Sequence, residues 1–160
     1  MTHARTPLTR TAALATLAAI TLGGLTATAE QANAATSRTT MKNGIVASVN
    51  DIRADHGCRP LKVAKALTRS AQRHADDMAR TRSFSHTSVD GRSWVKRQLA
   101  AGWKSPGGEN IARGYDKPSS VMTAWMNSPG HRRNILNCQF RYIGIGYNTT
   151  GEYSVQNFGY

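Results

Sequence analysis

Cysteine and acidic residues are scarce in this chain of 160 residues, which has only 2 Cys and 9 Asp plus Glu against 21 Lys plus Arg. Neither Cys has a CxxC or CxxH spacing, which excludes zinc fingers, thioredoxin-like redox motifs and c-type haem attachment. The sequence also has no GxSxG motif to present a nucleophilic serine. Aromatic residues make up 7%, and no nucleic-acid recognition motif accompanies the positive charge. We therefore expect one packed domain with no nucleic-acid partner.

The few carboxylates give little support to hydrolysis by a pair of acids. Four of them fit the solvent-exposed faces of helical patterns: Asp51, Asp55, Asp76 and Asp77. Glu109 differs from these, because it lies in a glycine-containing segment next to Asn110. Glycosidases normally use two carboxylates that face each other across the sugar. No such pair is evident, and the sequence alone assigns no catalytic residue.

No apolar run is long enough to cross a membrane as a helix. The apolar run Thr11–Leu25 contains no charged residue and has about 15 residues, and a span needs about 20. Arg5 and Arg10 precede it, and small-x-small cleavage sites end at Ala29 and Ala34. This order is typical of a secretory signal peptide. We predict cleavage after Ala34, with Ala29 as the alternative, and no transmembrane anchor.

The predicted organisation is a signal peptide over 1–34, a short flexible leader over 35–40 and one domain over 41–160. Cleavage removes two Arg and one Glu, so the mature 126 residues keep 19 basic and 8 acidic side chains, a net charge of +11. A secreted, extracellular protein of this charge attracts polyanions. We expect anionic cell-wall polymers, lipid headgroups or a small polar ligand as partners, and a monomer.

Cys58 and Cys138 are the only two cysteines, and export would carry them into an oxidising environment. We predict a disulfide between them. It would close a loop of about 81 residues, which a chain-entropy model values at roughly 4 to 5 kcal/mol. The alternative is a pair of buried free thiols.

Hydrophobic periodicity predicts an α+β domain, with helices packed on an antiparallel sheet. The first half of the domain should contain a helix from Met41 to Gly57, a second from Leu67 through Ala79, and a third that is capped by Asp90 and carries Trp94, Val95 and Leu99. A strand or extended link over Glu109–Ala112 should follow, then a fourth helix from Pro118 and a short fifth helix from Ser128. The chain should end in a hairpin of Tyr142–Tyr147 with Tyr153–Tyr160. The three tryptophans, Trp94, Trp103 and Trp125, are predicted to pack in the core and at its rim.

Two of the five histidines stand at points where the backbone changes direction. His86 follows an aromatic residue and a serine, and His131 follows Pro129 and Gly130. Functional side chains are common at such positions. His74, by contrast, lies within a helical pattern, so we expect it to be a half-buried helix residue.

Five motifs occur in the order found in one known family. They are FSHTSVDG (Phe84 to Gly91), GGENIARG (Gly107 to Gly114), AWMNSPGHRRNIL (Ala124 to Leu136), IGIGY (Ile143 to Tyr147) and QNFG (Gln156 to Gly159). Together they resemble the CAP superfamily, or SCP-like domains, named after cysteine-rich secretory proteins, antigen 5 and plant pathogenesis-related 1 proteins. The resemblance extends from about Met41 to Tyr160, and the cysteine contexts are similar to the bacterial secreted branch.

The resemblance implies an α-β-α sandwich with a cleft formed by His86, Glu109 and His131. In some members such a cleft holds a divalent metal such as zinc, and two imidazoles with one carboxylate suit that ion. No organic cofactor is expected. Eukaryotic members usually carry a second Glu after the tryptophan of the fourth helix, whereas here Trp125 is followed by Met126, Asn127 and Ser128. The usual candidate for a base that activates water is therefore missing.

Three functions remain open at this stage. The first is a secreted, non-catalytic protein whose cleft binds a divalent metal or a small polar ligand. The second is a metal-dependent hydrolase or peptidase that acts on extracellular or cell-wall polymers. The third is a lipid, sterol or polyanion binder that uses other surfaces. As a structural alternative to any ligand site, Glu109, Asn110 and His131 could form a polar network that ties a strand to a helix.

Overall fold

The computed structural model describes Met1 and residues 23–160, so most of the predicted signal peptide lies outside the described residues. The elements, in chain order, are α1 (Gly23–Asp55), β1 (Lys62–Val63), α2 (Lys65–Thr81), α3 (Trp94–Ala100), β2 (Pro106–Ala112), α4 (Pro118–Asn127), α5 (Pro129–Ile135), β3 (Tyr142–Asn148) and β4 (Tyr153–Gly159). None of the helices in this described part has an apolar stretch long enough to span a membrane.

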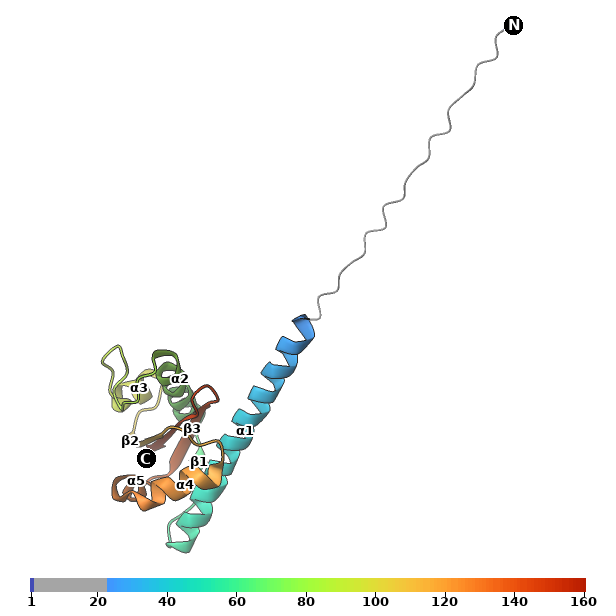
Figure 1. Cartoon of the computed structure of the whole chain (residues 1–160). Coiled ribbons are helices and arrows are strands. Elements are labelled where there is room, and N and C mark those ends of the chain that lie inside the picture. Colours follow the sequence, from blue (N-terminus) through green and yellow to red (C-terminus); the bar gives the residue numbers. More distant parts are fainter. Residues whose placement is uncertain (2–22) are drawn as a thin grey trace.

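A four-stranded sheet in the order β1-β3-β4-β2 separates two helical layers (Figure 1). Strands β3 and β4 form the predicted antiparallel hairpin, and β2 pairs antiparallel with β4. Helix α2 packs on one face of the sheet, while α1, α4 and α5 lie on the other side. The predicted α+β class and the α-β-α sandwich are both confirmed.

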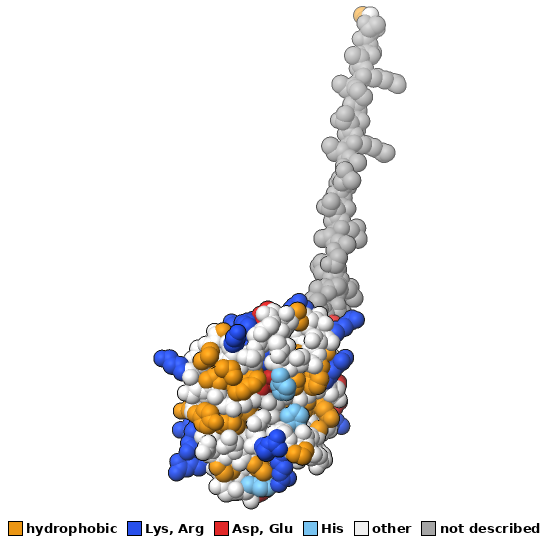
Figure 2. Space-filling view, turned by 90° about the vertical axis from the view of Figure 1, so that its left-hand side faces the viewer, with side chains coloured by type: hydrophobic (Ala, Val, Ile, Leu, Met, Phe, Trp, Pro, Cys, Tyr) orange, Lys and Arg blue, Asp and Glu red, His pale blue; other side chains and the backbone are white. Residues whose placement is uncertain are grey.

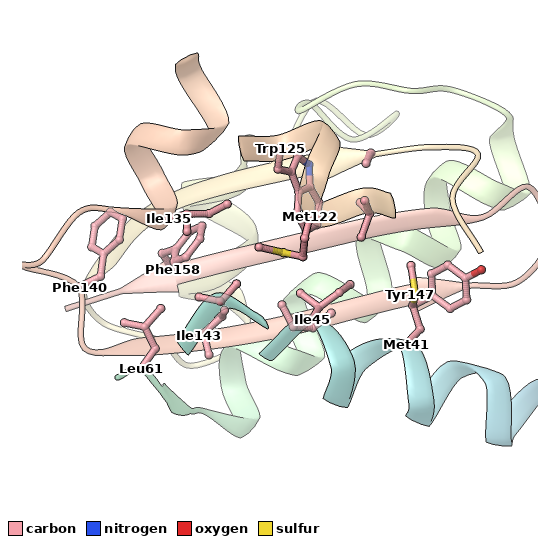
Figure 3. Close-up of a cluster of buried hydrophobic side chains, with 14 residues drawn as sticks. Met41, Ile45, Leu61, Met122, Trp125, Ile135, Phe140, Ile143, Tyr147 and Phe158 are labelled. Carbon is pink, nitrogen blue, oxygen red and sulfur yellow. The ribbon is translucent and has the colours of Figure 1, made fainter. Parts of the chain in front are cut away.

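The larger core lies between the sheet and the layer that contains α1 and α4 (Figure 3). Met41, Ile45 and Val49 recur every four residues along α1 and are almost completely buried, as the helical pattern predicts. Trp125 of α4 is buried too, and its indole Nε1 donates a hydrogen bond to the Ile111 carbonyl (3.2 Å). This core fixes α4 on β2, the strand that carries Glu109.

Helix α2 approaches β3 at two glycines. A Cβ atom at Gly144 would lie 2.2 Å from backbone atoms of Leu67 and Thr68, and one at Gly146 would lie 2.3 Å from the backbone of Ala71. Only glycine permits this spacing. His74, which we expected to be half-buried, is 1% exposed, and its Nε2 lies 2.9 Å from the Ser85 carbonyl oxygen.

The first helix is longer than predicted. It begins at Gly23 and includes residues 35–40, which were expected to form a flexible leader. Its end agrees with the prediction, because Gly57 adopts a positive φ of 71° two residues after Asp55. The side chains from Thr28 to Thr40 are exposed or half-exposed, so burial begins only at Met41.

The third helix is capped by a different residue from the one predicted. Ser93 accepts a hydrogen bond from the Lys96 backbone N–H, whereas the Asp90 carboxylate bonds to Arg92. Its buried face also differs from the expected apolar one. Arg97 and Gln98 point inward, while Leu99 is 50% exposed.

Two pairings connect distant parts of the chain. Strand β1 has only two residues, pairs in parallel with β3 and was not predicted. The predicted disulfide between Cys58 and Cys138 is present, across 80 residues of sequence. It joins the segment after α1 to the segment after α5.

Candidate functional site

Glu109 of β2 is a carboxylate whose side chain is completely buried and fully hydrogen-bonded. Its Oε1 accepts from the Nδ1 of His86 (2.9 Å), and its Oε2 accepts from the Nη2 of Arg97 (2.6 Å). The side-chain amide of Asn157 in β4 is oriented so that its nitrogen donates to Oε2 (3.1 Å) and its oxygen accepts from Ala71 N–H. Buried charges persist in proteins when they are paired in this way.

The bond to Glu109 sets the tautomer of His86. A carboxylate can only accept, so Nδ1 carries the proton and Nε2 of the neutral ring keeps a free lone pair. The His86 side chain is 50% exposed, whereas that of Glu109 is not exposed at all. A carboxylate behind a histidine in this arrangement orients the ring and raises its basicity as a ligand.

Arg97 connects Glu109 to the loop that carries His86. While its Nη2 contacts Glu109, its Nη1 donates to the carbonyl oxygens of His86 and Arg92 (2.9 Å each) and to the Ser88 hydroxyl (3.1 Å). The side chain is 5% exposed. Arg97 therefore holds the ends of the loop around the buried carboxylate.

His131 lies in α5, the helix that follows the Ser128–Pro129 turn. The amide of Asn110 holds its backbone, with Nδ2 donating to the His131 carbonyl (3.1 Å) and to the Gln156 Oε1 (2.8 Å). Asn134 in turn donates to the Asn110 Oδ1 (2.8 Å). These bonds link β2 to α5 through the backbone of His131, in the manner of the polar network named above as the structural alternative.

The imidazole of His131 is half-buried and close to His86. Burial, and then electrostatic repulsion between the two imidazoles, lower the pKa of His131. At neutral pH the His131 ring is therefore neutral. Figure 2 shows one face of the molecule on which histidine side chains lie among hydrophobic ones.

The contacts of Glu109 bear on its predicted role as a metal ligand. Within residues 23–160, no group of three or more His, Cys, Asp or Glu side chains is placed to hold a metal ion. Both oxygens of Glu109 are engaged by His86 and Arg97, so a direct bond from Glu109 to a metal would break an existing contact. His86 and His131 are free to donate lone pairs.

The histidines make stability depend on pH in a defined window. The pKa of His74 is lowered by burial and then by Arg97, and that of His131 is also lowered, so the unfolded chain binds these protons at a higher pH than the folded one. We expect the free energy of unfolding to be constant above about pH 7 and to fall as the pH drops through about 6.5. Urea unfolding at pH 7.5, 6.5 and 5.5 measures this.

The control variant is His74→Gln, which keeps an N–H donor for the Ser85 carbonyl that now receives the Nε2 bond (2.9 Å). In this variant the free energy of unfolding should change less between pH 7.5 and 5.5 than in the wild type. Unfolding free energy that rises on acidification over this range would contradict the assignment.

Arg97 and Asn157 could not be recognised as site residues in the sequence. An arginine in a helical segment is normally assigned to the solvent-exposed face. The sequence carried no signal to the contrary, because the outward position of Leu99, which turns Arg97 inward, is seen only in the structure.

The chain is similar to known proteins in both sequence and structure. The chain is 37% identical over 138 residues to the uncharacterized protein YkwD of Bacillus subtilis (strain 168), which covers 82% of this chain and 53% of that protein. It is 33% identical over 108 residues to the human Golgi-associated plant pathogenesis-related protein 1, covering 65% of this chain and 70% of that one.

Among solved structures, an extracellular protein containing an SCP domain from Bacillus anthracis str. Ames superposes with a TM-score of 0.73 at 29% identity, covering 76% of this chain and 41% of that one. The chain thus spans about half the length of YkwD and less than half of the B. anthracis protein. The model of the cysteine-rich secretory protein (CAP) family matches residues 46–158, and the chain belongs to this family.

Proposed function

We propose that this chain is an exported, non-catalytic CAP-domain protein that binds a divalent metal such as zinc, or a small polar ligand, between His86 and His131. The single observation that carries the proposal is the buried Glu109, which fixes the Nδ1 proton of His86 and leaves Nε2 as a solvent-facing lone pair. A histidine that binds a metal must be a neutral imidazole with a free lone pair on one ring nitrogen.

His131 supplies the second nitrogen in this proposal. Its lowered pKa keeps the ring neutral at neutral pH, so binding a cation does not have to displace a proton. The Asn110 amide holds its backbone and so restricts where the ring can lie. Imidazole nitrogens suit zinc, and the remaining coordination positions would be taken by water or by an external ligand.

The absence of a suitable base favours binding over hydrolysis. Glu109 is held by Arg97 and by His86, so it is not free to take a proton from a water molecule. Met126, Asn127 and Ser128 follow Trp125, where eukaryotic relatives usually carry a second acid. The site residues described above can hold and orient a ligand, and the one carboxylate among them is already engaged by His86 and Arg97.

Export is supported by the signal-like sequence and by the burial along α1. Cleavage after Ala34 would remove the exposed start of this helix and leave its buried residues from Met41 onward in place. The disulfide is also typical of an oxidising compartment. Mass spectrometry of protein from the culture medium tests this, and a mature chain that begins at Ala35 is the expected result.

Calorimetric zinc titration of the purified, oxidised protein at pH 7.5 tests the ligand site. We expect saturable binding with one ion per chain, and binding at least about tenfold weaker in His86→Ala/His131→Ala, because both imidazole ligands are lost. Glu109→Gln should weaken binding by about 10- to 100-fold, as loss of a supporting carboxylate does elsewhere. Magnesium, which prefers oxygen ligands, should not bind.

His56→Ala is the matched control for this titration. His56 lies near the end of α1, and its Nδ1 bonds to the Ile52 carbonyl (2.8 Å) instead of to the site. The control should bind zinc as the wild type does. No binding in the wild type, or equal binding in all variants, would reduce His86, Glu109 and His131 to a structural network.

A further inference from the structure

The corner of the molecule beside the disulfide contains a buried cation that has no anionic partner among residues 23–160. Arg53 of α1 is 0% exposed. Its guanidinium donates to four backbone carbonyl oxygens, at 2.8 to 3.3 Å, and these belong to Arg59, Ile135, Asn137 and Phe140. Burial and then a second cation, Arg141, lower the pKa of Arg53. Since buried charges are normally paired with opposite ones, this corner has a surplus of positive potential.

A surface hollow of about 300 Å³ lies in the same corner. It is lined by Arg59, Pro60, Lys62, Arg141 and Tyr142. Three of these residues are cations and none is an acid, so the hollow adds to the field of Arg53. An anionic group in it would meet several positive charges and no negative one from the lining.

The backbone that carries these cations is held in place. Arg53 bonds to the Arg59 carbonyl on one side and to the Phe140 carbonyl, next to Arg141, on the other. Arg141 itself donates to the Cys138 carbonyl (2.7 Å), and the disulfide ties Cys138 to Cys58. A preorganised anion site loses less entropy on binding than one built on a mobile loop.

One wall of the hollow is aromatic. Tyr142 is half-buried, and its ring meets the ring of Trp103 edge to face, with centroids 4.9 Å apart. An aromatic ring that is held in this way offers a flat apolar face with a polar edge. The C–H face of a sugar ring packs well on such a surface, whereas a bare inorganic anion gains nothing from it.

We propose that this hollow binds an anionic sugar polymer, with its phosphate or carboxylate group on Arg59, Lys62 and Arg141 and a neighbouring sugar ring on Tyr142. A lipid surface fits less well, because the site is concave and its lining has no large aliphatic side chain to insert. The proposal is independent of the His86–His131 site, with which it shares no residue.

Binding of the full, oxidised chain to defined polymers at two salt concentrations tests this. The probes are a phosphomannan, polygalacturonate, neutral dextran and vesicles of phosphatidylglycerol. We expect saturable, salt-sensitive binding to the anionic polymers and none to dextran, and the tighter of the two identifies the anion as phosphate or carboxylate. Arg59→Gln/Lys62→Gln should weaken this binding about tenfold, and Tyr142→Val about threefold.

The matched control removes two positive charges outside the hollow. Lys96→Gln/Lys117→Gln changes two exposed lysines that do not line the hollow, so its effect should be less than about twofold. Equal losses in the two double variants, or no polymer binding by the wild type, would overturn the site. Unchanged binding by folded Tyr142→Val would overturn the role of the sugar ring. Tighter binding to vesicles than to either polymer, lost in Arg59→Gln/Lys62→Gln, would assign the hollow to lipid instead.

Discussion

Replacing Arg97 by Met is expected to lower the free energy of unfolding by about 3 to 5 kcal/mol. The change removes the Nη2 bond to the buried Glu109 carboxylate and the Nη1 bonds that hold the loop at His86 and Ser88. Removal of one partner leaves the other charge buried without compensation, and this costs more than the pair contributed. Urea unfolding at pH 7.5, with the slope of the transition compared between variants, measures the loss.

A second substitution separates charge from packing. In Arg97→Met/Glu109→Gln neither charge remains, and the amide oxygen introduced at position 109 can still accept from Asn157, so we expect at least half of the lost free energy to return. Arg73→Met, an exposed arginine on α2, is the control and should change stability by less than about 0.5 kcal/mol. If the double variant is less stable than Arg97→Met, the unpaired carboxylate is not the cause.

Removal of the disulfide, by Cys58→Ala/Cys138→Ser, is expected to cost about 4 to 5 kcal/mol. The two cysteines are 80 residues apart, so the bridge restricts most of the unfolded chain of the domain. Ala suits Cys58, which is 6% exposed, and Ser suits the exposed Cys138. Denaturant unfolding of the variant beside the oxidised wild type measures the difference.

Chemical reduction supplies the control for this variant. Dithiothreitol should destabilise the wild type by the same amount and should leave the variant unchanged, because the variant has no bond to reduce. A loss of less than about 1 kcal/mol would mean that the unfolded chain is already compact without the bridge.

The parts of the fold that could be predicted are those governed by local patterns. Helix α2 and the β3–β4 hairpin follow from periodicities of four and two residues, and the burial of Met41, Ile45 and Val49 follows from their spacing along α1. Strand β1 could not be predicted, because two residues have no period and their pairing depends on a strand about 80 residues further along the chain.

The candidate site was predictable only in part, for a similar physical reason. His86, Glu109 and His131 belong to recognisable motifs, and Glu109 is unusual as an acid among glycines. The residues that contact the Glu109 carboxylate besides His86 are Arg97 and Asn157, which lie 12 positions before it and 48 after it. Arg97 looks like an ordinary surface residue in the sequence, and the motif that contains Asn157 does not indicate its partner. Their burial is favourable only because the fold brings them to the same carboxylate.

The glycines of β3 have a consequence for the width of the site. Gly144 and Gly146 let the backbone of α2 rest directly on the sheet, and α2 leads at its end into the segment that carries His86. Because these two residues have no side chain, the helix and the sheet lie as close together as their backbones allow. The height at which this segment leaves α2 above the sheet residue Glu109 therefore depends in part on two glycines outside the candidate site, in addition to the direct bonds between His86, Arg97 and Glu109.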